Sequence, residues 1–205
     1  LRFFIAVAAA GLLGFALGFI LRKYREIFFA MLSLAFSMVL YGLLAKAEFL
    51  GSTDGMSISP SSIFGYELGR FGLFYFISFF VICAIIFAQA YLRSSLGHLT
   101  TAISDNEIRV EYLGYSVEKA IHIKYVISAC LAGGAGGLMA ASLGQVDPDS
   151  MVLWSVSGEL VFVTIMSGLG NILAPFMGAV LFEFIRTYAF ELAPQAWQMI
   201  IGGTL

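Results

Sequence analysis

The chain is poor in charged residues and in the side chains on which catalysis and metal binding usually depend. Only 12% of its 205 residues are charged, whereas soluble domains carry about 25%. Two histidines and two cysteines are too few for a metal-ligand cluster, and both cysteines fall in apolar runs, where we expect small hydrophobic residues rather than a disulfide. No P-loop, HExxH, nucleophile elbow or CxxC motif occurs. We therefore expect no catalytic residue, no metal and no cofactor.

The net charge of −2 gives no basic excess, which excludes nucleic acid as a partner. What the chain has instead is hydrophobicity, because 60% of its residues are apolar. A bilayer core of about 30 Å requires about 20 apolar residues in a helix. The runs that reach or approach this length are Phe3–Leu21, Ile27–Ala45, Phe71–Leu92, Tyr125–Leu143, Gly158–Ser167 and Ile172–Phe190. The sequence predicts an all-α fold, a polytopic transmembrane helical bundle in the lipid bilayer.

We interpret residues 1–205 as a single transmembrane domain that is incomplete at both ends, because the chain opens without Met and stops inside an apolar run beginning near Trp197. The run Gly158–Ser167 is short for a membrane span, since ten residues reach only about 15 Å. Either its helix begins before Ser157 and includes Glu159, or it is a half-helix buried in protein. We favour a crossing.

Small residues mark two faces for close helix packing. Gly11, Gly14 and Gly18 recur at helical spacing in the first run, and Gly133 and Gly137 have the small-xxx-small spacing. Packing is the favoured role, although a transport pathway could use the same small residues. Candidates for the substrate pathway are the small or polar residues of the apolar runs, namely Ser33, Ser37, Gly133, Gly137 and Glu159.

Two acids in the apolar runs are functional candidates, because a charge inside the membrane is costly. Glu183 has Arg186 one turn away and could simply pair with it. Glu159 follows Ser157 closely and could simply stabilise a helix N-terminus.

The segment 93–124 carries eight of the 24 formal charges and both histidines. Ser104 and Glu107 have the spacing of a capping box, which predicts a short helix starting at Asp105 and stopping at Gly114. A second helix start is expected at Ser116. The segment is either an ordinary polar loop or a docking element for a soluble partner. Basic residues in short loops favour the side that holds Arg22–Arg25 and 93–124 as cytoplasmic, which leaves 46–70 outside.

Several motifs resemble one family, the inner-membrane permease subunit of branched-chain amino acid ABC importers. The residues that carry the resemblance are Ala102–Ile108 with Leu113-Gly114, Tyr24–Ala30 with Leu34–Phe36 (similar to RYRGIYFALLTLAF), Gly51–Met56 (similar to GGSDGL), Val126–Ala129 with Ala132-Gly133, Asp147-Pro148, Gly168–Asn171 and Gly178-Ala179. They cover the chain from about Arg22 onward, and the first helices of a complete permease are expected to be missing.

The resemblance implies a short cytoplasmic coupling helix that docks on an ATP-binding subunit. The family's EAA…G pattern maps onto Ile108, Arg109, Val110 and Gly114, of which the glycine is kept. The residues expected to couple to the ATPase are Ser104, Asp105, Asn106, Glu107, Ile108, Arg109, Glu111, Tyr112 and Gly114. Thr53, Asp54 and Gly55 are expected to contact an extracytoplasmic binding protein.

The implied partners are a homologous permease subunit, ABC ATPase subunits and a substrate-binding protein, at a bacterial inner membrane. The chain itself is then a non-enzymatic permease subunit for branched-chain or other small amino acids. Two alternatives stay open: a permease of the same family for urea or short amides, and a free-standing secondary carrier or channel.

Overall fold

The computed structural model describes residues 2–47, 55–57, 62–63, 66–67, 69–168 and 171–192. They form two compact units, Leu1–Leu153 and Trp154–Leu205. Within the described residues, five helical segments are long and apolar enough to cross a membrane: Phe3–Leu21, Glu26–Lys46, Phe71–Arg93, Val117–Leu143 and Pro148–Ser167. The predicted all-α bundle of membrane-spanning helices is confirmed.

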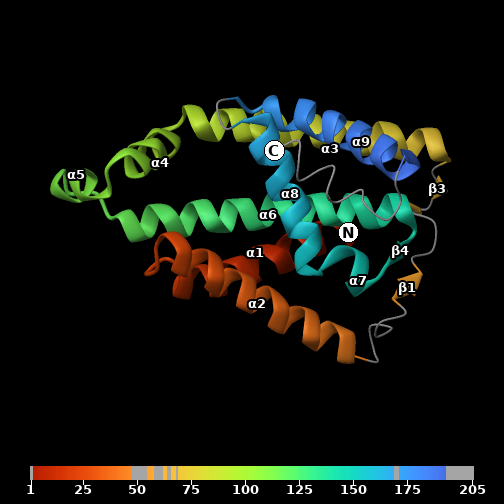
Figure 1. The fold of residues 1–205 in the computed structure, drawn as a ribbon, viewed down its shortest axis with the longest axis horizontal. Helices are drawn as coiled ribbons and strands as arrows, with labels where there is room; N and C mark the ends of the chain where they lie inside the picture. The colour runs from red at the N-terminus through yellow and green to blue at the C-terminus, as the bar shows by residue number, and fades with distance from the viewer. Residues whose placement is uncertain are drawn as a thin grey trace. The chain divides into compact units, whose positions relative to one another are not determined.

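The first unit consists of helices with a few two-residue strands (Figure 1). Its helices are α1 (Arg2–Leu21), α2 (Glu26–Lys46), α3 (Arg70–Arg93), α4 (Ser95–Asp105), α5 (Glu107–Tyr112), α6 (Val117–Leu143) and α7 (Pro148–Met151). Its strands are β1 (Met56–Ser57), β2 (Ser62–Ile63), β3 (Tyr66–Glu67) and β4 (Gln145–Val146). β1 pairs antiparallel with β4, and β2 with β3. The expected second helix start at Ser116 is confirmed, because Ser116 is the N-cap residue of α6.

Glycines bring α1 and α6 into close antiparallel contact, which confirms the close-packing role that the spacing of these glycines predicts. A Cβ placed on Gly14 would lie 2.4 Å from the Cβ of Ala129, and one on Gly11 would lie 2.8 Å from the Sγ of Cys130. On α6, a Cβ on Gly133 would lie 2.3 Å from the Cβ of Ala10. Such distances require that the residue has no side chain. The packing role of these glycines is therefore what the structure shows.

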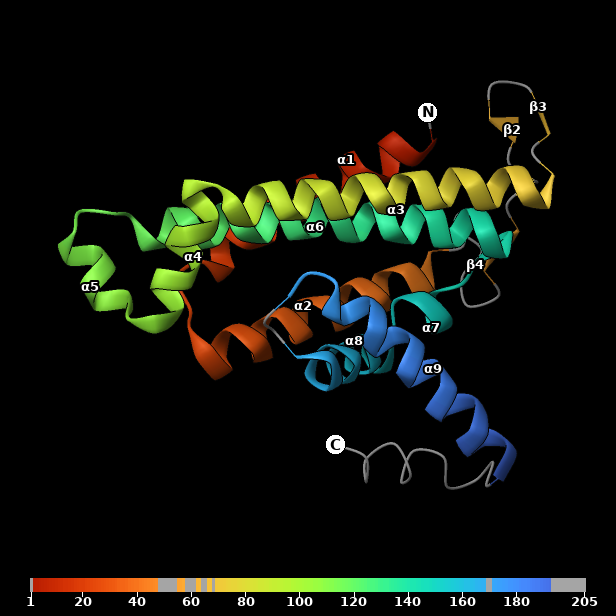
Figure 2. The ribbon, with the colours of Figure 1, turned by 90° about the horizontal axis from the view of Figure 1, so that it is seen from above.

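The two ends of α6 carry different elements (Figures 1 and 2). α4 and α5 lie at its N-terminal end, which we call the α5 end. β4, β1 and α7 lie at its C-terminal end, which we call the β4 end. Because α1 runs antiparallel to α6, the turn Arg22–Arg25 lies at the α5 end as well. The two basic segments therefore lie at the same end of α6, where they are in direct contact, as described below.

The second unit contains α8 (Trp154–Ser167) and α9 (Ala174–Leu192), which pack against each other. α8 begins before Ser157 and includes Glu159, which is the first of the two alternatives given for the run Gly158–Ser167, a helix that starts earlier than the run itself. Its 14 residues span about 21 Å. Arg186 lies 3.8 Å from Glu159 and 3.9 Å from Glu183, so the pairing predicted for Glu183 is confirmed. The expected run near Trp197 lies outside the described residues.

Candidate functional site

A sharp corner separates α3 from α4 and carries the chain away from the long helices. Ser94 caps α4, since its hydroxyl accepts a hydrogen bond from the amide of Gly97 at 3.4 Å. A Cβ on Gly97 would lie 2.4 Å from the carbonyl oxygen of Leu92. The corner between α3 and α4 thus depends on a glycine at position 97, because any side chain there would collide with the end of α3.

The start of α5 differs from the capping box expected at Ser104. Ser104 and Asp105 belong to α4, and Asn106 is the N-cap residue: its Oδ1 accepts a hydrogen bond from the amide of Arg109 at 2.9 Å. The capping box of Ser104 and Glu107 and the start at Asp105 were wrong. Asparagine is as good a cap as serine, and the carboxylate of Glu107 is engaged elsewhere.

The end of α5 is as expected. Gly114 has φ +85, and its amide donates to Glu111 O at 2.9 Å, while the amide of Tyr115 donates to Val110 O at 3.3 Å. These two bonds form a Schellman motif, for which glycine is the favoured residue. α5 is therefore a six-residue helix that is capped at both ends.

α5 has one buried side and one exposed side. Val110 is 3% exposed, and Val117 and Ala120 at the start of α6 are buried as well. On the other side Tyr112 is 88% exposed, with Ile108 and Leu113 also largely exposed. An exposed apolar edge on a short, anchored helix is typical of a surface that binds another protein.

Two ion pairs join α5 and the start of α6 to the turn between α1 and α2. Arg25 Nη2 lies 2.8 Å from Glu107 Oε1, and Arg22 Nε lies 3.6 Å from Glu118 Oε2. Both side chains of the first pair are about one-third exposed. Sequence reasoning missed this partner of Glu107, although the expectation that both segments share one side could have indicated it.

The remaining residues of the predicted coupling set stay at the surface. Ser104 lines a cavity of about 180 Å³ between α4 and α6, together with Thr100 and Lys124. Asp105 and Arg109, which the spacing allows to pair, form no ion pair in the part of the chain that the structure describes. Glu111 is exposed.

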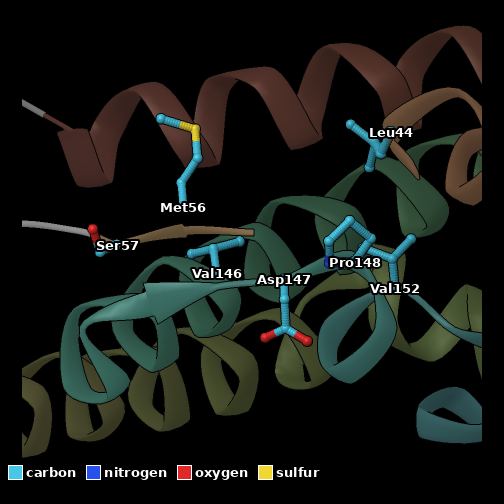
Figure 3. A pocket seen from close by; sticks show the side chains of 7 residues that line it. All are labelled: Leu44, Met56, Ser57, Val146, Asp147, Pro148 and Val152. Carbon is cyan, nitrogen blue, oxygen red and sulfur yellow. The ribbon is translucent and has the colours of Figure 1, made fainter. Parts of the chain in front are cut away.

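At the β4 end an apolar pocket of about 360 Å³ lies beside the paired strands (Figure 3). Its lining is Leu44, Met56, Ser57, Val146, Asp147, Pro148 and Val152. Asp147 caps α7, since its Oδ2 accepts from the Ser150 amide at 3.0 Å, and its carboxylate points away from the apolar side chains in Figure 3. The hydroxyl of Tyr41 donates to Asp149 Oδ1 at 2.6 Å, which joins α2 to α7.

Of the expected binding-protein contacts, Thr53 and Asp54 lie outside the described residues. Gly55 precedes β1 with φ +72, and a Cβ on it would lie 2.5 Å from Val146 O.

The candidates for the substrate pathway lie on α2 and α6. Ser33 of α2 donates to Ala30 O at 2.8 Å, and Ser37 is half-buried one turn further along the same helix. Gly137 packs near Ala6 of α1, like Gly133.

Five helices suited to crossing a membrane, with a capped helix outside them, define a multi-pass membrane protein, as the expected localisation in a bacterial inner membrane requires. The whole chain, residues 1–205, matches the family model described as branched-chain amino acid transport system / permease component. The chain belongs to this family.

Two curated relatives carry the name high-affinity branched-chain amino acid transport system permease protein LivM. The one from Escherichia coli strain K12 is 29% identical over 216 residues, and the one from Salmonella typhimurium strain LT2 is 28% identical over 216 residues. Each match covers 91% of this chain and 51% of the relative, so the chain spans about half the length of these relatives. No solved structure gives a significant match.

Proposed function

We propose that this chain forms part of a permease subunit of an ATP-binding-cassette importer. With a related permease it forms the pathway for branched-chain or other small amino acids delivered by an extracytoplasmic binding protein. The match of the whole chain to the permease family carries the proposal. ATP hydrolysis belongs to a separate subunit, which drives the permease from outside the membrane.

The α5 end is the docking site for that ATPase in this proposal, and it faces the cytoplasm. Ile108, Tyr112 and Leu113 supply an exposed apolar edge, and Glu111 supplies an exposed charge beside it. Glu107 contributes less charge to a partner, because Arg25 already holds its carboxylate. A groove on the ATPase with an apolar floor and a basic rim would complement this surface.

In the first unit, the candidate substrate pathway follows α2 and α6; in the second unit, the candidate is Glu159 of α8. Ser33 and Ser37 are the better candidates on α2, a helix with no buried residue among those described. Gly133 and Gly137 are packed against α1 and would act by letting helices approach. Specificity then lies chiefly in the binding protein, which we place at the β4 end, on the segment 46–70 that includes Thr53, Asp54 and Gly55.

The test is reconstitution of the full-length permease in liposomes with and without its partner permease, ATPase and binding protein. We expect uptake of branched-chain amino acids only when all are present and ATP is supplied. Uptake by the permease alone, driven by a proton or sodium gradient, would contradict the proposal and favour a free-standing carrier.

Docking is tested by co-purification of the ATPase with two variants of α5. Glu111→Lys reverses the exposed charge, and Glu107→Gln removes a charge that Arg25 already neutralises. We expect Glu111→Lys to weaken co-purification more than Glu107→Gln. Unchanged co-purification and unchanged substrate-stimulated ATP hydrolysis in both variants would contradict a role of α5 in binding the ATPase and would leave it as part of a connecting loop.

A further inference from the structure

One guanidinium joins α5 to the turn between α1 and α2. Arg25 Nε donates to both carboxylate oxygens of Glu107, at 2.8 Å and 3.0 Å, and Nη2 lies 2.8 Å from Oε1. Its Nη1 donates to the carbonyl oxygen of Tyr24 at 3.0 Å and to that of Arg22. The planar fork of arginine is the side chain suited to hold a carboxylate and two carbonyls at once.

The turn held in this way is strained. Glu26, the first residue of α2, has φ +50, in the left-handed region that residues with a Cβ rarely occupy. Such a conformation persists only where surrounding contacts maintain it. The contacts of Arg25 with the Arg22 and Tyr24 carbonyls lie directly before Glu26.

A second link secures the turn from the α1 side. The guanidinium carbon of Arg22 lies 4.2 Å above the ring of Phe19, and its Nε lies 3.6 Å from Glu118 in the first turn of α6. α1 is also packed closely on α6 through its glycines. α1 is thus fixed to α6, whereas none of the described residues of α2 is buried.

We propose that Arg25 is a positioning residue that transmits a displacement of α5 to α2, an inference that rests on the proposed coupling of α5 to an ATPase. A movement of α5 pulls on Glu107, and Arg25 passes it to the Arg22–Glu26 turn. Since α1 is fixed on α6, the turn responds by changing the direction of α2. That helix carries Ser33 and Ser37, so the movement reaches the candidate substrate pathway.

An ordinary surface ion pair would behave differently, because it would contribute only to folding or assembly. The quantity that separates the two roles is the number of amino acids transported per ATP hydrolysed. A structural contact alters how much complex forms, and a transmitting contact alters this ratio in the complex that has formed.

The experiment uses the full-length permease assembled with its partner permease, ATPase and binding protein in liposomes. The variants are Arg25→Gln, Arg25→Lys and Glu107→Gln, with Lys23→Gln as the matched control. Lys23 is an exposed cation in the same turn, and it makes no ion pair among the described residues. Transport and ATP hydrolysis are both measured per assembled complex.

We expect Arg25→Gln to lower the transport-to-hydrolysis ratio by about fivefold or more, the lower end of typical coupling between two sites. Arg25→Lys should lie between Arg25→Gln and the wild type, because an ammonium keeps the charge but cannot bind the carboxylate and both carbonyls. Lys23→Gln should match the wild type. If Arg25→Gln does not assemble, Glu107→Gln weakens the same contact from the α5 side, because it removes the charge and one of the two acceptor oxygens, and it is expected to lower the ratio as well.

If the wild-type importer couples transport to ATP hydrolysis and every variant that assembles has the same transport-to-hydrolysis ratio, the role of Arg25 is overturned. The proposed function would still stand. A wild-type permease that transports without any ATPase would instead overturn the proposed function, and the role of Arg25 with it.

Discussion

At the α5 end, charged side chains join segments 82 residues apart in the chain, whereas at the β4 end the joining bonds involve no pair of opposite charges within the described residues. There, β1 and β4 pair through their backbones, and Tyr41 donates to Asp149. Ion pairs are sensitive to salt and to the charges of a partner, whereas backbone pairing depends on local geometry. The difference suits one end to respond to a partner and the other to hold a shaped surface.

The largest expected effect is in the labelling of thiols from each side of the membrane, because we expect the two ends to face opposite sides. Ser57→Cys and Glu111→Cys place a thiol at an exposed position of each end, after Cys83 and Cys130 are replaced by alanine. We expect an impermeant thiol reagent to modify Ser57→Cys only from outside and Glu111→Cys only from the cytoplasm. Modification of both thiols from the same side would contradict the placement of the two ends on opposite sides of the membrane. The reverse pattern would show that the α5 end faces outside and the β4 end faces the cytoplasm.

The next effect concerns the α1–α6 contact, which both ends share. Gly14→Leu forces a side chain against Ala129 and should destabilise the protein by about 3 kcal/mol, the upper range for overpacking. Gly136→Leu is the control, because a Cβ there meets no atom within 4 Å. Thermal unfolding in detergent measures both, and equal loss of stability in the two variants would contradict the close packing.

The close-packing face of α1 could be predicted because its cause is local, whereas its partner α6 could not. Gly11, Gly14 and Gly18 recur at the helical period, and the period alone places them on one face. The stop of α5 at Gly114 was predictable for the same reason, since a left-handed C-cap is a property of a single residue. The long apolar runs likewise determined the helices by length alone.

The start of α5 could not be predicted from spacing. Ser104 and Glu107 satisfied a local rule, but Asn106 competed for the cap and Arg25 competed for the carboxylate. The second competitor is 82 residues away, and no local pattern contains it. The strands β1 and β4 were missed because two residues are too short to show a period.

The helix caps allow the two ends to be loosened separately. Asn106→Ala removes the cap of α5 and Asp147→Ala that of α7, each at a cost of about 0.5–2 kcal/mol. Each variant should speed amide hydrogen exchange at its own end by about two- to thirtyfold, since 1.4 kcal/mol corresponds to a factor of ten. Asp147→Asn keeps a capping oxygen and should stay near the wild type. Faster exchange at both ends in either variant would show that the ends are not independent.

The smallest effect is that of salt. Raising the ionic strength from 0.1 M to 1 M shortens the screening length from about 10 Å to about 3 Å and weakens partly exposed ion pairs. Such pairs contribute about 0.2–1 kcal/mol each, so exchange of the α5 amides should rise by up to about fivefold while that of β4 and α7 stays constant.

Arg25→Gln is the matched test of that salt effect, because it removes the pair with Glu107 and leaves the pair of Arg22 with Glu118. In this variant α5 should exchange faster at low salt and respond less to added salt, whereas Lys23→Gln should respond like the wild type. An equal response to salt at the α5 end and the β4 end would contradict the assignment of charge-based stabilisation to the α5 end alone. A response at α5 that survives in Arg25→Gln would shift that stabilisation from Arg25 to Arg22 and Glu118, whose contact is longer, at 3.6 Å.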